Sequence, residues 1–454
     1  MTLERTSTNQ SRRSKRSHHS HSNSETHSRS HNSIRRTRTN QSLNGKETPD
    51  HLQGHLNHLT PDQERALEEF KAVCVEKGLY TPAEEGKAAS HEDPTLLRFL
   101  RARKFDVNGA LDQFKATEEW RKANQIDALY ENFDVDSYEN ARRVYPQWTG
   151  RRDRRGIPVY VFVIKHLNSK NMAAYSSGAA STATSSTHTS STVPSRLLRL
   201  FALYENMTRF VVPLCSSLPR PNPETPISST TNIVDISGVG LKQFWNLKGH
   251  MQDASVLATA HYPETLDRIF IIGAPSFFPT VWGWIKRWFD PVTTSKIFIL
   301  SSSEVKSTLT SFMDPSSFPK QYGGELDWEW GDMPNLDEPA QELVGALEEL
   351  GPKGDGEIST ESSNKTVEER KRNFVKGPVA WLKDRIEIFG SIGGQKRRKT
   401  IPVQGEQKPS ESDQAVVSEA NGVVIEVTPA ATTEGEEKLV TTPEAQVNGT
   451  TVSS

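Results

Sequence analysis

Four short segments between residues 158 and 300 are almost wholly apolar, and stretches with helical periodicity separate them. The candidate strands are residues 158–164, 232–236, 268–272 and 296–300, and the candidate helices are residues 196–213, 241–258 and 278–289. Strands without alternating polar residues are typical of a parallel sheet that helices cover on both faces. The pattern therefore predicts an α/β fold built on a mostly parallel, mixed sheet.

A small all-helical module is predicted before this sheet. Thr60 has the residue type of an N-cap, Pro61 suits the first helical position, and Gln63 completes a capping box. Two further helical patterns begin at about residues 93 and 108, each with apolar residues three and four positions apart. We expect the module to span residues 60–125 and the α/β domain to span residues 126–350, ending in a short helix from about residue 342.

The segments around this core are polar and low in complexity. Residues 1–59 are rich in Ser, His and Arg, and such a stretch cannot bury enough apolar surface to offset its chain entropy. We predict a disordered basic tail there, a disordered insertion at residues 175–191, and a mostly disordered tail over residues 351–454. Residues 379–389 interleave apolar and charged side chains, which fits either an interfacial amphipathic helix or a solvated tail.

Composition and missing motifs exclude several classes of protein. Lys and Arg (55) nearly balance Asp and Glu (57), which disfavours a general nucleic-acid binder. Cys74 and Cys215 are the only cysteines, so a disulfide framework is not expected. The uncharged stretch at residues 269–285 contains two glycines and two prolines, and we interpret it as strand, turn and helix rather than a membrane span. Common nucleophile, metal and phosphate-loop motifs are absent from the sequence, so we expect no metal, no cofactor and no enzyme activity.

Four short sequence strings occur along the chain in a fixed order. They are TLLRFLRARKFD from Thr95, YPE from Tyr262, FDPVTTSKIFIL from Phe289 and FPKQYGG from Phe318. Together they resemble the CRAL-TRIO lipid-binding family with its N-terminal helical module. The likeness is strongest to the fungal phosphatidylinositol/phosphatidylcholine transfer proteins of the secretory pathway, and it covers about residues 60–350.

The resemblance implies two headgroup sites. For phosphatidylinositol, Arg103 and Lys296 would pair with the phosphate, while Glu264 and Thr293 would hydrogen-bond and orient the headgroup. For phosphatidylcholine, the family uses a tyrosine on the first strand and two hydroxyl residues before a later strand. The matching residues are Tyr160, Thr230 and Asn232. Asn232 departs from the hydroxyl pattern, which puts the second ligand in doubt.

The helix after Pro279 has the composition of a gate over a lipid pocket. Five apolar residues fall along one of its sides, namely Phe278, Val281, Trp282, Ile285 and Phe289. Phe277 and Trp284 project elsewhere, beside Lys286 and Arg287. A helix that is apolar on more than one side can face a ligand and a bilayer at once. An ordinary core helix with some exposed aromatic residues has the same pattern, and the resemblance favours the mobile gate.

These observations predict a phospholipid transfer protein that holds phosphatidylinositol in a closed pocket and exchanges it at membranes, without a cofactor other than the bound lipid. The resemblance further implies a monomer in the cytoplasm, attached peripherally to Golgi or other endomembranes, with a role in vesicle trafficking and in presenting lipid to a lipid kinase. One alternative is a sensor or scaffold that binds another hydrophobic ligand, such as a sterol. A second alternative is a lipid-modifying enzyme.

Overall fold

A computed structural model describes residues 52–177, 195–288, 294–349, 374–382 and 384–403. The chain divides into two compact units, residues 1–53 and residues 54–454, and the description below concerns the second. Most of the predicted tails and most of the predicted insertion lie outside the described residues.

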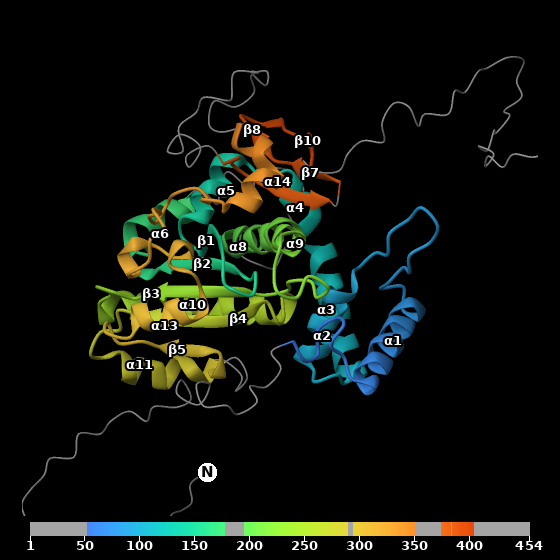
Figure 1. Ribbon diagram of the computed structural model, residues 1–454, viewed down its shortest axis with the longest axis horizontal. Helices are drawn as coiled ribbons and strands as arrows, with labels where there is room; N and C mark the ends of the chain where they lie inside the picture. Colours follow the sequence, from blue (N-terminus) through green and yellow to red (C-terminus); the bar gives the residue numbers. More distant parts are fainter. Residues whose placement is uncertain (1–51, 178–194, 289–293, 350–373, 383, 404–454) are drawn as a thin grey trace, which may run out of the picture. The chain divides into compact units, whose positions relative to one another are not determined.

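The centre of this unit is a five-stranded sheet with the order β1-β2-β3-β4-β5 (Figure 1). The strands are β1 (Gln147–Arg152), β2 (Pro158–Val163), β3 (Thr230–Asp235), β4 (Leu266–Ile272) and β5 (Ile297–Ile299). Strands β2 to β5 run parallel, and β1 pairs with β2 in the antiparallel direction. The predicted mostly parallel, mixed sheet is confirmed, and β1 is the edge strand that the sequence pattern did not reveal.

Alternate residues of the strands face two different environments, as the pleat of a strand requires. Val159, Val161 and Ile233 are buried in a core on one face, where they pack with α13 (Val305–Phe312). Tyr160 and Asn232, from the alternate positions, face the other side. One face of the sheet therefore packs into a close-packed core, and the other face borders a cavity beneath the helices.

Helices cover that second side of the sheet. They are α8 (Ser195–Asn206), a π-helical turn (Met207–Val211), α9 (Val212–Ser217), α10 (Leu241–His261), α11 (Phe278–Ile285) and a 3₁₀ turn (Lys286–Trp288). The predicted helix at residues 196–213 is thus interrupted by a π turn and continues to Ser217. The predicted helix at residues 278–289 ends as a regular helix at Ile285, and Phe289 lies outside the described residues.

The N-terminal module consists of α1 (Pro61–Glu76), α2 (Asp93–Ala102) and α3 (Val107–Ala123). The capping box between Thr60 and Gln63 is present, as predicted. Order begins earlier than residue 60, because the Asn57 side chain donates a hydrogen bond to the Glu224 carbonyl at 2.6 Å. Two short helices, α4 (Ile126–Glu131) and α5 (Val135–Arg142), lead from the module to the sheet.

Short helical segments complete the α/β domain. They are a 3₁₀ turn (Ile164–His166), α6 (Ser169–Ser177), two 3₁₀ turns (Pro315–Ser317 and Lys320–Tyr322) and α14 (Glu338–Glu349). The prediction that the insertion begins at residue 175 is wrong, because Tyr175 is buried within α6 and its ring lies 4.1 Å from the Arg199 guanidinium. The low apolar content of residues 175–191 does not reveal that Tyr175 is buried, because its packing partner Arg199 is 24 residues away in the chain.

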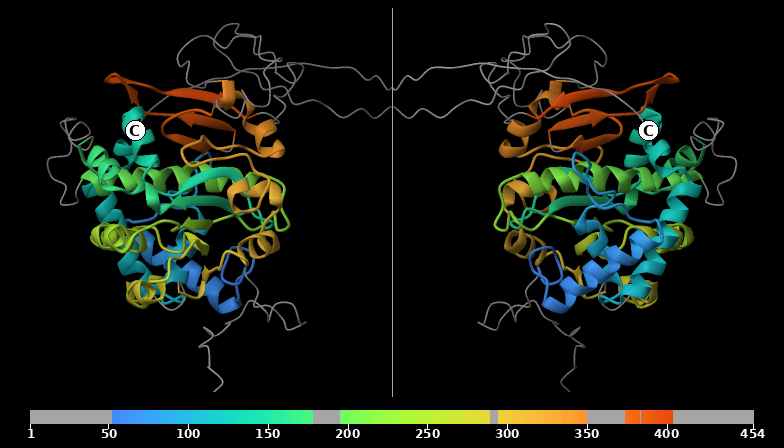
Figure 2. Two further views of the ribbon diagram at one scale, coloured as in Figure 1. Left: turned by 90° about the vertical axis from the view of Figure 1, so that its left-hand side faces the viewer. Right: turned by 90° about the vertical axis from the view of Figure 1, so that its right-hand side faces the viewer.

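Residues 379–382 and 385–388 form strands, so the prediction of an amphipathic helix or a solvated tail at residues 379–389 is wrong. The sheet has the order β10-β7-β6 and lies beside α14 (Figure 2). Its strands are β6 (Val379–Leu382), β7 (Arg385–Ile388) and β10 (Lys399–Pro402), and a small hairpin of β8 (Ser391–Ile392) and β9 (Gln395–Lys396) lies between β7 and β10. Val379, Ile386 and Ile388 are each 1% exposed, and Pro378 directly precedes the first strand.

No helix among the described residues has both the length and the apolar character needed to cross a membrane.

Candidate functional site

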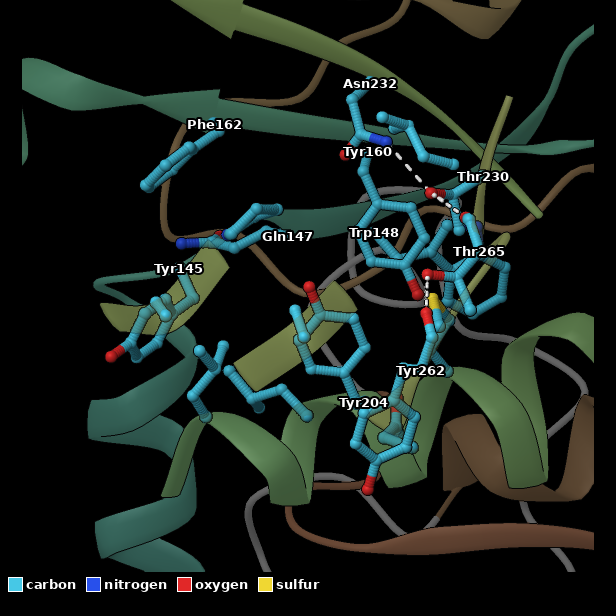
Figure 3. Close-up of a pocket in the computed structure, with 18 of the residues that line it drawn as sticks. Tyr145, Gln147, Trp148, Tyr160, Phe162, Tyr204, Thr230, Asn232, Tyr262 and Thr265 are labelled. Carbon is cyan, nitrogen blue, oxygen red and sulfur yellow. Dashed lines mark hydrogen bonds between the residues drawn. The ribbon is translucent and has the colours of Figure 1, made fainter. Parts of the chain in front are cut away.

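A cavity of about 730 Å³ lies between the open face of the sheet and the helices α8 and α10. One row of residues in register crosses its floor, from Trp148 through Tyr160 and Asn232 to Ile269. Figure 3 labels the first three of them. The N-terminal module and the segment that precedes the C-terminal sheet each contribute to the walls. Such a volume is in the range of cavities that enclose a small organic ligand.

The end of the cavity near β4 and β5 is cationic and polar. The Lys296 Nζ lies 3.2 Å from the Glu264 Oε2 and donates a hydrogen bond to the Leu266 carbonyl at 3.0 Å. Both side chains keep about a quarter of their surface exposed, at 25% for Lys296 and 24% for Glu264. They are close enough to solvent to meet an entering charged group, yet held in place by protein partners. Thr293, the fourth predicted headgroup residue, lies outside the described residues.

The end of α2 brings further cations to the same place. Arg103 and Lys104 are exposed and line the cavity, as the resemblance implies for Arg103. Arg101 also lines it, and its Nη2 lies 3.5 Å from the Glu264 carbonyl and 3.4 Å from the Ser228 Oγ. Burial lowers the pKa of Arg101 to about 10, so the guanidinium remains charged at neutral pH. Arg101 is not among the predicted headgroup residues, although it belongs to the basic cluster at the end of α2.

Two loops at this end have strained backbones. Glu264 has φ 55°, and Lys104 and Phe105 have φ 54° and 64°. These residues have side chains that disfavour the left-handed region, and each such position destabilises the fold by about 1–3 kcal/mol. These left-handed residues lie in the two segments that carry the predicted headgroup residues Arg103 and Glu264, and Asn57 and Gln125 have the same conformation away from the cavity.

A chain of hydrogen bonds lines the middle of the cavity. The Asn232 amide donates to the Thr230 hydroxyl at 2.9 Å, and that hydroxyl donates to the Thr265 carbonyl at 3.2 Å (Figure 3). Tyr160 lies opposite Asn232 in the neighbouring strand, and burial raises the pKa of its phenol, which is therefore a neutral donor. The three residues predicted for a second headgroup are thus brought together, with Asn232 bonded to its own neighbour.

Aromatic side chains and one unusual amide line the remaining walls. Tyr204 stacks on Tyr262 at a centroid distance of 4.8 Å, and burial raises the pKa of Tyr204 to about 12.

Gln147 is 1% exposed and its Oε1 accepts from Arg142 and from the Gly331 N–H, but its Nε2 has no partner among the described residues. Because the two donors fix the amide orientation, this nitrogen can donate to a ligand or water in the cavity. No pattern in the sequence indicates this role of Gln147.

The predicted gate residues pack behind the cavity wall. Phe278 and Val281 are buried in the core that contains Phe244, and Trp282 stacks on Phe278 at 6.3 Å. Among the described side chains of α11, none lines the cavity, but Met251 and other cavity residues belong to the same core cluster. A movement of α11 would therefore open that cluster. The Ile285 side chain and Phe289 lie outside the described residues.

The outer surface near α11 carries exposed tryptophans. Trp245 on α10 is 56% exposed and Trp284 on α11 is 42% exposed, and their rings meet edge to face at 5.9 Å. The Lys248 Nζ lies 5.0 Å from the centre of the Trp245 ring, and Lys286 and Arg287 follow Trp284 in the chain. Exposed tryptophans beside lysine and arginine are typical of surfaces that enter the interface of a membrane.

Comparison with known proteins shows the family. Residues 142–324 match the protein family described as "CRAL/TRIO domain", and residues 66–116 match the family described as "CRAL/TRIO, N-terminal domain". The SEC14 cytosolic factor of Eremothecium gossypii is 30% identical over 277 residues, which are 61% of this chain and 80% of that protein. The chain belongs to the CRAL/TRIO family.

A plant relative and a solved structure match over different shares of their length. The phosphatidylinositol/phosphatidylcholine transfer protein SFH9 of Arabidopsis thaliana is 29% identical over 58% of this chain and 41% of that protein. The crystal structure of Sfh5 matches 60% of this chain and 89% of that structure with a TM-score of 0.43 at 15% identity, a likeness too weak to support a conclusion. Both CRAL/TRIO matches end before residue 325, so the sheet at residues 379–402 lies beyond them.

Proposed function

We propose that this CRAL/TRIO protein binds one phosphatidylinositol-type phospholipid in the cavity and exchanges it at membrane surfaces without changing it covalently. One observation carries the proposal: a single cavity has a cationic, hydrogen-bonding end at Lys296 and Glu264 and a largely aromatic and aliphatic interior. The names of the relatives, SEC14 cytosolic factor and phosphatidylinositol/phosphatidylcholine transfer protein, support the same function.

The chemistry of the ligand matches the two parts of the cavity. A phosphodiester has one negative charge, which Lys296, Arg101 and Arg103 can neutralise by charge-assisted hydrogen bonds. The inositol hydroxyls need acceptors as well as donors, and the Glu264 carboxylate is an acceptor at the same end. The two acyl chains contain roughly thirty methylenes that are each stabilised by about 0.8 kcal/mol on burial, so the lipid cannot cross water without a shielding protein.

Phosphatidylcholine is the second ligand in this proposal. Tyr160, Thr230 and Asn232 line the same cavity deeper along β2 and β3. The Thr230 hydroxyl already donates to the Thr265 carbonyl, so the donors left for a phosphate are the Tyr160 phenol and the second N–H of the Asn232 amide, one fewer than three free hydroxyl residues would supply. We therefore expect weaker binding of phosphatidylcholine than of phosphatidylinositol.

Exchange requires contact with a bilayer, and we assign that contact to the surface of Trp245 and Trp284. The two rings and the neighbouring Lys248 combine apolar area with positive charge, which suits an anionic cytoplasmic leaflet. This surface lies on α10 and α11, the helices whose buried sides form the core next to the cavity. Residence at the Golgi, a monomeric state and presentation of the lipid to a lipid kinase remain predictions from the resemblance.

A transfer assay tests the proposal. Donor vesicles that contain labelled phosphatidylinositol, labelled phosphatidylcholine or a labelled sterol are mixed with unlabelled acceptor vesicles and the purified protein. We expect rapid movement of phosphatidylinositol, slower movement of phosphatidylcholine and no movement of the sterol, with every lipid recovered chemically intact. Movement of the sterol alone would support a sterol sensor, and a cleaved or modified lipid would support an enzyme.

A further inference from the structure

The segment that leads into β6 lies directly against the cavity. Phe374, Val375 and Gly377 line it, although they follow the CRAL/TRIO match by about fifty residues. Phe374 is 6% exposed and Val375 is 3% exposed, so both are as buried as residues of the main core. The C-terminal segment is therefore structurally a part of the cavity wall.

Specific hydrogen bonds hold this segment in place. The buried Tyr130 hydroxyl of α4 donates to the Val379 carbonyl at 2.6 Å and accepts from the Val379 N–H at 2.9 Å. The Gly377 N–H donates to the Glu139 carboxylate of α5 at 3.1 Å. Gly377 has φ 90°, and a Cβ there would lie 2.8 Å from the Arg397 Nη2. These contacts fit one backbone position closely, as expected of a fixed wall.

The wall stands at the opposite end of the cavity from the headgroup residues. The Phe374 ring lies 6.4 Å from the ring of Trp148 on β1 and 6.0 Å from the ring of Phe210. Lys296 directly precedes β5, at the other edge of the sheet. Four spacings of about 4.8 Å separate β1 from β5, which gives roughly 19 Å across the sheet. A lipid with its phosphate at Lys296 would extend its hydrocarbon toward Phe374.

We propose that the C-terminal segment is part of the lipid site and that Phe374 ends the cavity, so that it sets the length of the acyl chain that fits. This inference rests on the proposed function, since it needs a phospholipid in the cavity. The surroundings of Phe374 are suited to a chain terminus, because Trp148, Phe210 and Val375 present apolar surface to it.

The size of side chain 374 should then control which lipid is retained. Each additional methylene that becomes buried changes the relative occupancy of two lipids by about fourfold, which is about 0.8 kcal/mol converted at 1.4 kcal/mol per tenfold. Phe374→Ala removes the ring from the end of the cavity and should enrich longer acyl chains. Phe374→Trp occupies more of that end and should enrich shorter ones.

The experiment measures acyl-chain lengths of the lipids that copurify with the full-length protein, by extraction and mass spectrometry. The matched control is Phe389→Ala. Phe389 directly follows β7 and is 5% exposed, but it does not line the cavity, so the variant removes the same ring from a buried position outside the site. We expect a shift to longer chains in Phe374→Ala, a shift to shorter chains in Phe374→Trp, and the wild-type distribution in Phe389→Ala. Phe374→Leu replaces Phe374→Ala if the latter does not fold.

Two other outcomes are distinguishable. If every variant retains phospholipid with the wild-type chain distribution, or if Phe389→Ala shifts it as much as Phe374→Ala, the inference about Phe374 is overturned and the proposed function stands. If the wild type copurifies with no phospholipid, the proposed function itself is overturned.

Discussion

Replacement of Lys296 by alanine separates the binding role of this residue from its structural role. The residue forms one ion pair with Glu264 at 3.2 Å and one hydrogen bond to the Leu266 carbonyl at 3.0 Å, and its side chain is 25% exposed. Partly exposed ion pairs stabilise folded proteins by about 1 kcal/mol or less. We therefore expect Lys296→Ala to lower the free energy of unfolding by only about 1 kcal/mol.

The expected loss in lipid binding is larger. A hydrogen bond between a charged donor and a charged acceptor that are partly removed from water contributes about 1.5–3 kcal/mol. Loss of the Lys296 contact with the lipid phosphate should thus weaken phosphatidylinositol binding by roughly 10- to 150-fold. Transfer of labelled phosphatidylinositol between vesicles measures this loss at low protein concentration, and urea denaturation of the same preparation measures stability.

A surface lysine provides the control. Lys320 pairs with Asp327 at 3.4 Å, and the two side chains are 63% and 61% exposed and do not line the cavity. Lys320→Ala should leave transfer unchanged. Wild-type transfer by Lys296→Ala would refute the assignment of the phosphate site. A loss of transfer that accompanies a fall of more than about 3 kcal/mol in the free energy of unfolding would show instead that the pair supports the fold.

Three further predictions test other parts of the account. Asn232→Thr places a hydroxyl where the family pattern has one, and transfer of phosphatidylcholine should rise while transfer of phosphatidylinositol stays the same. The double change of Trp245 and Trp284 to alanine should weaken association with anionic vesicles in a flotation assay by about tenfold, about 1.4 kcal/mol, with the lipid content of the protein unaltered. Burial lowers the pKa of His261 to about 4, so the unfolded chain binds its proton first as the pH falls below about 6.5. Because the ring is partly exposed, the free energy of unfolding in urea should fall by about 1–2 kcal/mol between pH 7 and pH 5, and His261→Phe should remove that part of the decrease.

The sequence pattern predicts the parts of the fold whose residues are uniform in character. Strand β2 (PVYVFV) and the second half of β4 (IFII) are runs of β-branched and aromatic residues, and the pattern predicts both strands to within two residues of their observed bounds. Strand β1 reads QWTGRR and has no apolar run, because it is an edge strand with polar neighbours. The segment at residues 379–388 fits both a period of two and a helical spacing in sequence. Its packing against the π turn at Met207–Val211, about 170 residues away, decides between them.

The candidate site shows the same division. Arg103, Glu264 and Lys296 can be named because each stands in a recognisable string, and the structure shows all three in the lining of one cavity. Arg101 and Gln147 could not be named, since their roles arise from the orientation of a helix and of an amide. The place of Phe374 in the cavity wall also cannot be predicted from the sequence, because it depends on a long-range contact with Trp148.

Native mass spectrometry of the full-length protein, purified without added lipid, tests the central claim most directly. We predict a 1:1 complex whose added mass is that of an intact phosphatidylinositol, and its loss in Lys296→Ala. An added mass that corresponds to a sterol, or a protein that stays free of lipid even after incubation with phosphatidylinositol vesicles, would contradict the account.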